Sequence, residues 1–576
     1  MHTVETVLLV LMLGALSGIA ARYARAVPLP LIQIALGAAL SWPQQGLHIR
    51  FDPELFLLLF IPPLLFADGW RIPKREFFTL YKPILRLALG LVLFTVLGLG
   101  YFVHWMIPQM PLPVAFALAA VVSPTDAVAV SAITRNLGMP SKTMHILEGE
   151  SLLNDASGLV ALKFAVAATL TGLFSWTHVA RDFTWMALGG LGIGALMGWG
   201  FAKARDTITR RVGDVAAPQM ALLLVLLPFA AYILGEQIGV SGILAAVAAG
   251  IATNFADLQR GEFVAERMQT EGLWTLVETS FNGAIFLLLG LQLPSIIGTT
   301  LSEAGPDRWR LLGYVAAIST ALLLLRWVWL RLGVRGALLR AHATGKMIER
   351  PSLLLNLATT LAGIRGAVTL AAALSVPIAL ENGEPFPARD LLVFLAMGTI
   401  LFTLVVGSIG LPLVLRRLPP VGEPLAAREE RRARVAACEA AIASLGLSKE
   451  QMARHSPEWL AQYQEVAGRT AQDYRKRIDM LDDNPEVDRT PEAQAETPGL
   501  IQQRRKRYVL ELETRLKCLK VERETHYAER RANRINDESL RSLVHELDLS
   551  EVSLEKRLAV SRHAAGMNKG KEPPRH

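Results

Sequence analysis

Long apolar runs fill most of the first 420 residues of this 576-residue chain. A helix that crosses a bilayer needs about 20 mainly apolar residues, and thirteen runs come close to that length. The runs predict an all-α membrane protein with about thirteen transmembrane helices. Their approximate ranges are 4–22, 27–43, 54–70, 83–107, 112–134, 144–173, 183–203, 218–236, 238–254, 272–298, 311–331, 352–380 and 391–416.

Charged residues divide the chain in two. Residues 1–420 hold 54 of the Asp, Glu, Lys and Arg side chains, and the much shorter stretch 421–576 holds 56. Only the second part has the charge density of a soluble protein. We therefore predict a transmembrane domain at 1–420 and a helical domain at 421–576. Within the tail we expect helices near 424–446, 455–482, 499–534 and 537–563, with a linker at 482–499.

The placement of basic residues predicts the topology. Lys and Arg gather in cytoplasmic loops, and they alternate between the predicted loops most clearly if the N-terminus lies outside. The tail is then cytoplasmic, which fits its two isolated cysteines, Cys438 and Cys518, and a reducing compartment. No Lys or Arg precedes Arg22, so the first run is expected to be a retained helix and not a signal peptide. We predict a multi-pass protein of the plasma (inner) membrane.

The net charge of +8 could suggest a nucleic-acid partner. The tail is nearly neutral, however, and the basic excess lies mostly in the short loops between apolar runs, where membrane topology explains it. The sequence therefore predicts a lipid bilayer as the surrounding partner and no nucleic acid.

The sixth apolar run is interrupted by the polar stretch EGESLLNDASG. At about 100° per residue on a helix, Glu150, Ser151, Asn154 and Asp155 fall on one face, and the opposite face is apolar. Charges at bilayer depth are costly and usually mark a transport pathway. This run is therefore expected to turn a polar stripe inward, with Ser151 and Asp155 one turn apart.

The fifth run contains a second polar site, in AFALAAVVSPTDAVAVSAI. Pro124 removes a backbone donor and disfavours helical geometry at Ser123. The helix should break there, and broken backbone at this depth is tolerated only where it lines a cavity or is buried in protein. Thr125 and Asp126 stand at the break. Together with unpaired carbonyl groups they offer oxygen ligands that suit a small alkali cation.

The twelfth run carries Arg365 between Gly363 and Gly366. A buried Arg needs a partner, and the expected partner is a carboxylate of the polar stripe. The two glycines predict a second interrupted helix. Interrupted helices seven runs apart, at corresponding places in two halves, indicate an inverted-repeat transporter with its site near the membrane midplane.

Three strings together carry a family resemblance: SPTDAVAVSAI, EGESLLNDASGLVALKFA and GIRGAVTLAAALSVP. They resemble the Na⁺/H⁺ antiporters of the monovalent cation:proton antiporter superfamily, in its NhaP/NHE-like electroneutral branch. IPPLLFADGW and FLLLGLQLP are similar to the same branch, and the resemblance covers residues 1–420. It implies a homodimer in which each protomer has a core of inverted repeats, with two broken crossing helices, that moves against an interface domain.

The resemblance also implies roles for the polar residues. Asn154 and Asp155 match the family's Asn-Asp pair, which makes Asp155 the carrier of both cation and proton. Thr125 and Asp126 match the broken-helix end that holds the cation or its water, and Ser151 matches a ligand hydroxyl. The transported metal cation is therefore expected at Asp155, Asp126, Thr125 and Ser151.

Three further residues have implied supporting roles. Glu150 and Arg365 match an ion pair that shapes the site, and Asp68 occupies a place where relatives often carry an acid. The resemblance does not extend into the tail, which we expect to be regulatory. No cofactor is implied, since Na⁺ and H⁺ are the transported substrates.

The chemistry of exchange is competition for one group. A carboxylate can hold a proton or a cation, and Asn154 is neutral where electrogenic relatives carry a second acid. If Asp155 is the sole carrier, one proton exchanges for one cation. The sequence therefore predicts an electroneutral secondary transporter, not an enzyme, that works by alternating access in pH and sodium homeostasis. Preference for K⁺ over Na⁺ or Li⁺ stays open, because the ligands are generic oxygens.

Other classes of protein are disfavoured. A channel needs a continuous pore with a filter, and none is evident. An intramembrane hydrolase would need Ser151 to reach Lys163, but on a straight helix they lie about 18 Å apart. An acidic lining argues against an anion carrier.

Overall fold

The computed structural model describes most of the chain, and packing contacts divide it into two units, Met1–Val421 and Gly422–His576. The described residues are 2–20, 27–42, 53–134, 137, 139–171, 176–212, 217–256, 264–304, 308–344, 352–380, 384–418, 425–446, 456–481, 498–532, 534 and 537–564.

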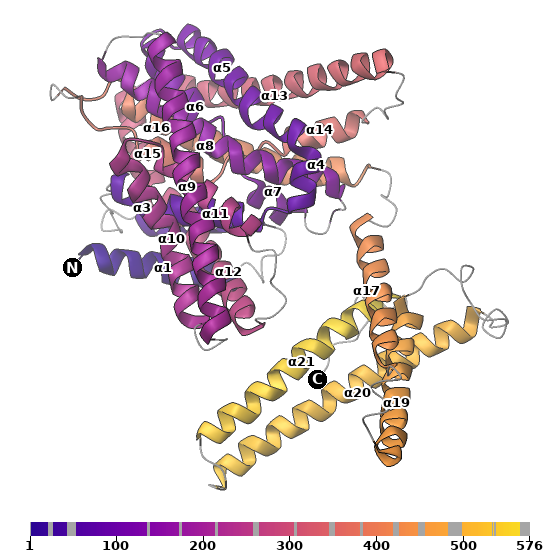
Figure 1. Ribbon diagram of the computed structural model, residues 1–576. Helices are drawn as coiled ribbons and strands as arrows, with labels where there is room; N and C mark the ends of the chain where they lie inside the picture. The colour runs from indigo at the N-terminus through magenta and orange to yellow at the C-terminus, as the bar shows by residue number, and fades with distance from the viewer. Residues whose placement is uncertain are drawn as a thin grey trace. The chain divides into compact units, whose positions relative to one another are not determined.

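The first unit is a bundle of helices (Figure 1). Their bounds are α1 (His2–Ala20), α2 (Leu29–Ser41), α3 (Pro53–Arg71), α4 (Lys74–Leu85), the π-helical η1 (Arg86–Leu91), α5 (Val92–Met106), α6 (Leu112–Val121), α7 (Ala127–Thr134), α8 (Ser141–Thr171), α9 (Trp176–Val212), α10 (Ala217–Ile238), α11 (Gly242–Ala256), α12 (Val264–Ala304), α13 (Arg308–Thr344), α14 (Leu353–Leu361), α15 (Ala367–Leu374) and α16 (Arg389–Leu415).

Each of the thirteen predicted runs overlaps one helix or one group of consecutive helical segments. In the described part of the chain, eight helical segments are long and apolar enough to cross a membrane, and three shorter apolar helices accompany them. The all-helical membrane fold is therefore confirmed. The count of thirteen crossings stays a prediction, because several of the helices are too short or too polar to establish a crossing by composition.

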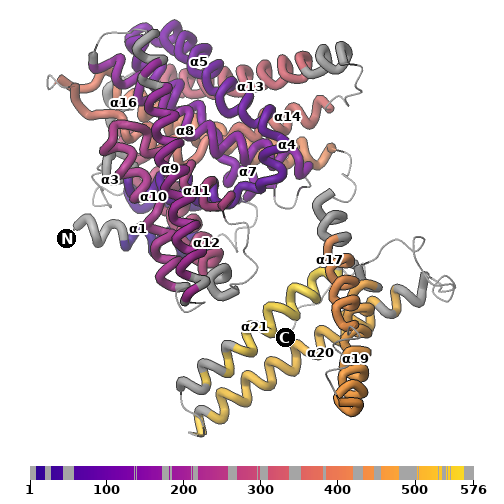
Figure 2. Tube along the Cα trace, viewed as in Figure 1, coloured from indigo at the N-terminus to yellow at the C-terminus, as the bar shows by residue number. Residues whose placement is uncertain are grey.

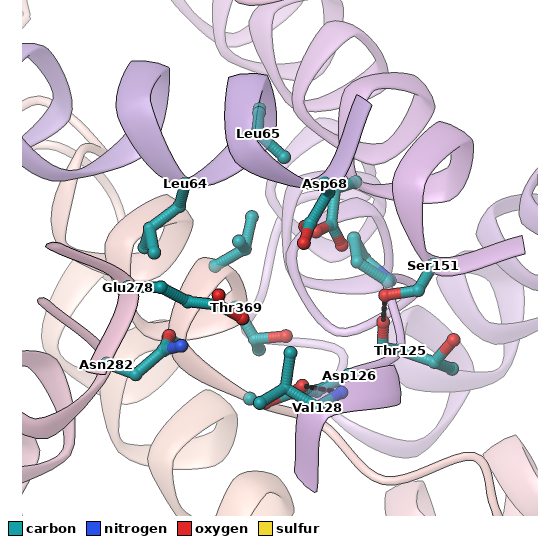
Figure 3. Close-up of a pocket in the computed structure, with 15 residues that line it drawn as sticks. Leu64, Leu65, Asp68, Thr125, Asp126, Val128, Ser151, Glu278, Asn282 and Thr369 are labelled. Atoms are coloured by element: carbon teal, nitrogen blue, oxygen red, sulfur yellow. Dashed lines mark hydrogen bonds between the residues drawn. The ribbon is translucent and has the colours of Figure 1, made fainter. Parts of the chain in front are cut away.

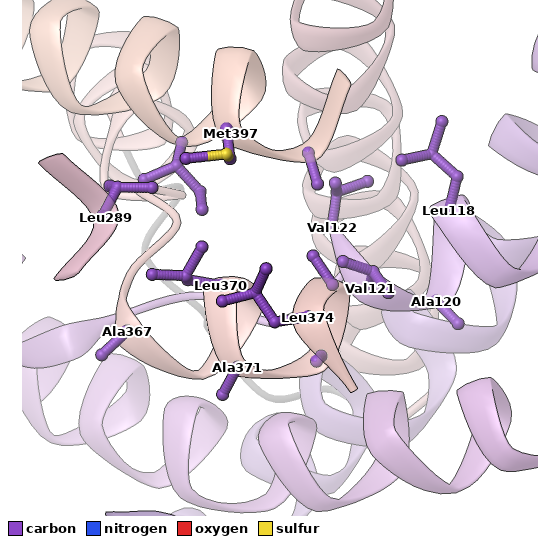
Figure 4. Packing of buried hydrophobic residues seen from close by; sticks show 14 of the residues in the cluster. Leu118, Ala120, Val121, Val122, Leu289, Ala367, Leu370, Ala371, Leu374 and Met397 are labelled. Carbon is purple, nitrogen blue, oxygen red and sulfur yellow. The ribbon is translucent and has the colours of Figure 1, made fainter. Parts of the chain in front are cut away.

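The centre of this unit is formed by short helices that are buried along almost their whole length. In α6 nearly every residue from Val114 onward is buried, and α15 is buried likewise. Figure 4 shows Val121 and Val122 near Leu370 and Leu374, with Met397 of α16 above them. In lipid, association of helices depends on close packing more than on the hydrophobic effect, so this tight centre fixes where the broken segments lie.

Helix α11 packs most extensively against α9 and α3. Its sequence, GILAAVAAGIATNFA, consists largely of small residues, and small residues let helix backbones approach closely in membrane proteins. Because α11 anchors α3, this packing also positions Asp68, which lies in the last turns of α3.

The second unit consists of α17 (Leu425–Ser444), α19 (Pro457–Leu481), α20 (Pro498–Arg531) and α21 (Asp537–Ala564). These bounds agree with the predicted tail helices to within three residues. Helices α20 and α21 form a long hairpin, which can be followed along the trace in Figure 2. Residues 482–497 of the predicted linker, and residues 419–424 at the predicted domain junction, lie outside the described part of the chain.

Candidate cation site

Two interrupted helices meet at the centre of the first unit. The fifth run stops at Val121 and resumes at Ala127, around Pro124, and the twelfth stops at Leu361 and resumes at Ala367. The backbone N–H of Asp126 donates a hydrogen bond of 2.8 Å to the carbonyl oxygen of Ile364. The two predicted breaks are therefore present, and they contact one another directly.

Arg365 serves the backbone of these breaks. It is 2% exposed, its Nε donates to the Val122 carbonyl oxygen at 2.8 Å, and its Nη1 donates to the carbonyl oxygen of Gly363. These are carbonyl groups that the interrupted helices leave without an N–H partner. Arg365 thus donates a hydrogen bond to a carbonyl group at each of the two breaks.

The predicted ion pair between Glu150 and Arg365 is wrong in its basic partner. Glu150 pairs with Arg326 of α13, whose Nη2 lies 2.8 Å from Oε2 and whose Nη1 contacts Oε1. Arg326 also donates from Nε to the Thr359 carbonyl oxygen at 3.0 Å. The guanidinium of Arg365 is occupied by carbonyl groups. Both terminal nitrogens of Arg326 instead reach the Glu150 carboxylate on the polar stripe.

Helix α8 fixes the first break through side chains of its polar stripe. The Ser151 hydroxyl donates to the Thr125 carbonyl oxygen at 2.8 Å and accepts from the Ala127 N–H at 3.3 Å. The Asn154 amide donates to Thr125 Oγ1 at 2.8 Å. These contacts bring four of the predicted site residues together: Thr125, Asp126, Ser151 and Asn154.

Asp126 caps the N-terminus of α7. Its Oδ1 accepts hydrogen bonds from the N–H groups of Val128 and Ala129, at 2.8 and 3.0 Å, as a helix-capping carboxylate does. The opposite side of the carboxylate approaches Gly366, where an added Cβ would collide with it. Only a residue without a side chain fits between the two breaks at this point.

A small cavity of about 30 Å³ lies beside the breaks, which is room for one or two water-sized particles. Four carboxylates line it: Asp68 of α3, Asp126, Asp155 of α8 and Glu278 of α12. In Figure 3, Asp68 lies above the open space, Asp126 lies below it, and Ser151 and Thr125 lie to its right. The structure therefore joins the predicted residues Asp68, Asp126 and Asp155 at one space.

Asp155 differs from Asp126 in its hydrogen bonding. It is 6% exposed, and among the described residues its carboxylate accepts no hydrogen bond, whereas Asp126 accepts two from the backbone. A buried carboxylate without a donor is poorly stabilised as an anion. Binding of a cation or a proton would stabilise this carboxylate.

The far side of the cavity is formed by residues that the sequence did not single out as ligands. Asn282 of α12 and Thr369 of α15 line it beside Glu278. The Glu278 carboxylate forms an ion pair with Arg71 at the end of α3, and Arg71 also lies 3.3 Å from the hydroxyl of Thr275. Polar groups of α3, α12 and α15 thus complete the oxygen lining.

Some predicted residues lie away from the cavity. Asn154 is not among its lining residues and acts on it through Thr125. Lys163 pairs with Glu236 of α10 at 2.7 Å. Helix α8 runs without interruption through both Ser151 and Lys163, so they do not form the pair that a hydrolase would need.

Sequence reasoning missed Arg326, although a signal for it was present. Arg326 lies inside the run LLLLRWVW, so the rule that flags charges at bilayer depth applies to it as it does to Arg365. Asn282 and Thr369 are uncharged residues in apolar runs, and such residues commonly make only helix–helix hydrogen bonds. Their position at the cavity could not be inferred from their type.

The polar side chains that line the cavity carry hard oxygen atoms. Among the described residues, no three His, Cys, Asp or Glu side chains form a group that could hold a metal ion. Carboxylates spaced around a small space, with hydroxyl and amide oxygens between them, suit hard monovalent ions. The arrangement can bind such an ion and release it.

Comparison with known proteins gives the family. Residues 7–417 match the model of the sodium/hydrogen exchanger transmembrane family. The chain belongs to the sodium/hydrogen exchanger family. This family consists of transporters, and membership agrees with the resemblance that the three polar strings carry and with the apolar helices of a multi-pass membrane protein.

Individual relatives in this family cover different shares of the chain. An uncharacterised Na⁺/H⁺ exchanger of Escherichia coli K12, YjcE, is 42% identical over 95% of this chain and 98% of its own length. A sodium, potassium, lithium and rubidium/H⁺ antiporter of Bacillus pumilus is 44% identical over 71% of this chain, and the match spans 60% of that protein's length.

The fold has been seen in a solved exchanger. The structure of the sodium proton antiporter MjNhaP1 from Methanocaldococcus jannaschii aligns with a TM-score of 0.56 at 21% identity, over 73% of this chain and all of that one. At this identity the likeness concerns the fold, and it supports the all-helical antiporter architecture.

Proposed function

We propose that this protein is a secondary active antiporter that exchanges Na⁺ for H⁺ across the membrane by alternating access. One observation carries the proposal: a small carboxylate-lined cavity lies where two interrupted helices meet, in a chain of the sodium/hydrogen exchanger family. Such a cavity can hold one cation or its water, and broken helices at this depth are typical of transporter binding sites.

Asp155 is the proposed carrier group, with Asp126, Thr125 and Ser151 as cation ligands. Asp126 is held by two backbone N–H groups, which stabilise its charged form. Asp155 has no such donors among the described residues, so it is the carboxylate that must gain a proton when the cation leaves. Asn154 and Glu150, with Arg326 and Arg365, shape the site and do not bind the transported ions.

Exchange follows from competition at Asp155. Na⁺ and H⁺ cannot occupy one carboxylate together, so each displaces the other. The apparent KM for Na⁺ should rise as the pH falls on the side that Na⁺ enters from. With Asp155 as sole carrier the exchange is one for one, and its rate should not respond to an imposed membrane potential.

The decisive experiment measures dissipation of a pH gradient in everted membrane vesicles on addition of Na⁺. We expect the wild type to respond and Asp155→Asn to be inert, since an amide cannot take up a proton. Asp390→Asn, at an exposed position at the start of α16, is the matched control and should respond like the wild type. Retained exchange in Asp155→Asn would refute the assignment.

The range of cations is tested in the same vesicles. The Bacillus pumilus relative is named for sodium, potassium, lithium and rubidium, and the oxygen lining offers no ligand that selects chemically among them. We propose Na⁺ and Li⁺ as substrates, with K⁺ as the alternative main cation. A larger response to K⁺ than to Na⁺ at equal concentration would favour that alternative.

We propose that the protein lies in the inner membrane with its N-terminus outside and its tail in the cytoplasm. The distribution of basic loops supports this orientation. The chain has two cysteines, both in the tail, and Cys518 is exposed. A membrane-impermeant thiol reagent should therefore label everted vesicles and spare right-side-out ones. The reverse pattern would overturn the orientation.

We further propose that residues 1–420 form the transport domain of a homodimer and that residues 421–576 regulate it. The family resemblance supports the dimer, and the helical tail that follows the matched family region supports a separate role. Light scattering of the purified 62.9 kDa chain tests the dimer. Removal of the tail should shift the pH dependence of exchange and leave transport itself intact.

A further inference from the structure

The tail unit contains a cavity of about 370 Å³ where all four of its helices meet. Side chains from α17, α19, α20 and α21 line it. This volume lies within the range of pockets that bind small organic ligands. Nothing in the proposed transport cycle uses this cavity.

The formally charged side chains that line this cavity in the described residues are all arginines. Arg434 of α17, Arg477 of α19 and Arg557 of α21 all border the cavity, and its described lining includes no Asp or Glu. Guanidinium groups from three different helices thus border one space. Arg presents a planar fork of donors that matches phosphate oxygens in two-point contacts. The arrangement therefore favours a ligand with more than one negative charge.

The lining also offers aromatic and apolar surface. The Arg477 guanidinium lies over the Tyr474 ring, 4.9 Å from its centroid, and Arg477 also hydrogen-bonds the Tyr508 side chain. Burial raises the pKa of the Tyr508 phenol above its ordinary value, so this group stays uncharged near neutral pH and does not oppose an anion. Aromatic faces and Arg planes are surfaces on which planar bases stack.

Small residues leave room for a flat group. Ala437 and Ala441 of α17 and Val560 of α21 line the same cavity, and none of them projects far enough to fill it. Ser561, which is 5% exposed, adds a hydroxyl near Arg557 along α21. The cavity thus combines a phosphate-binding charge pattern with an apolar, partly aromatic wall.

From this combination we propose that the four-helix tail binds a nucleotide, with Arg434, Arg477 and Arg557 on its phosphates and the tyrosines beside its base. The ligand has two chemically different parts, and the cavity supplies a matching surface for each. A nucleotide bound here would brace the four helices together, which gives the tail a means of responding to the energy state of the cell.

Binding is tested by calorimetry on the purified full-length protein in detergent, with three probes: ATP, tripolyphosphate and adenosine. We expect ATP to bind saturably and at least tenfold more tightly than either of the others. Tripolyphosphate that binds as tightly as ATP would overturn the nucleotide assignment, as would the absence of saturable binding of ATP.

The location is tested with matched arginine variants. Arg557→Gln removes a charge from the cavity, whereas Arg515→Gln removes one from α20 that pairs with Glu511 along its own helix. We expect Arg557→Gln to weaken ATP binding at least tenfold and Arg515→Gln to leave it unchanged. A conservative Arg557→Lys should restore part of the affinity. Equal loss in Arg557→Gln and Arg515→Gln would refute the site.

Folding of the variants is checked by a readout that does not depend on the ligand. The melting midpoint of each variant without ATP should equal that of the wild type, and ATP should raise the midpoint of the wild type and of Arg515→Gln only. A midpoint of Arg557→Gln that rises with ATP as the wild type does would also refute the proposal.

Discussion

Arg326 and Glu150 form a two-pronged ion pair in which the side chains are only 2% and 1% exposed. Removal of one member of such a pair leaves an uncompensated buried charge, which costs about 3–5 kcal/mol. We expect Arg326→Met to lower the free energy of unfolding in mixed micelles by about that amount. Arg335→Met, at an exposed position further along α13, is the matched control and should change it little.

The same pair allows a test of coupling. Because replacement of both ions by apolar residues of similar size is often nearly neutral, Glu150→Met combined with Arg326→Met should be more stable than either single variant. A double variant whose loss equals the sum of the two single losses would show that the residues act independently.

Asp126 combines two tasks that substitution can separate. Asn caps a helix about as well as Asp, whereas Ala loses about 0.5–2 kcal/mol. Asp126→Asn should therefore keep the melting temperature of the wild type, and its apparent KM for Na⁺ should rise at least tenfold because the ligand charge is gone. Asp126→Ala should lose both affinity and stability. An unchanged KM in Asp126→Asn would limit this residue to capping.

Gly366 allows the two interrupted helices to touch. A Cβ at this position would collide with the Asp126 carboxylate, so Gly366→Ala should reduce the initial rate of Na⁺-driven exchange at least tenfold. Gly313→Ala on α13, where an added Cβ has nothing within 4 Å, should exchange normally. Wild-type rates in Gly366→Ala would mean that the contact between the breaks is dispensable.

Ser151 joins α8 to the first break. Its hydroxyl makes two hydrogen bonds to backbone groups there, and one hydrogen bond is worth about 0.5–1.5 kcal/mol. Ser151→Ala should raise the apparent KM for Na⁺ by about tenfold in the vesicle assay. Ser157→Ala, six residues further along the same helix, removes only a hydrogen bond of 2.8 Å to the Leu153 carbonyl oxygen and should leave the KM unchanged.

Much of this architecture could be read from the sequence, because the signals involved are local. Apolar run length predicts helices in lipid, and Pro124 and the glycines around Arg365 predict the two interruptions. The tail helices followed from composition and turn signals in the same way. What failed was the pairing of distant charges. The sequence flagged Glu150 and Arg365 as partners by type, but several arginines lie in apolar runs, and only tertiary packing decides which guanidinium meets which carboxylate.

Some site residues likewise had a local sequence signal, and others did not. Asp155, Ser151 and Asp126 were identifiable because polarity stands out against apolar neighbours at helical spacing. Asn282 and Thr369 were not, since an isolated amide or hydroxyl gives no direction. Their place at the cavity depends on how α12 and α15 rotate against α3, and no short-range pattern encodes that rotation.

Arg365 holds the carbonyl groups at both interruptions with its own permanent charge. The interruption in each helix therefore needs no bound cation to keep its shape. A proton or a cation bound at the proposed carrier Asp155 would then find the same backbone geometry at the two breaks.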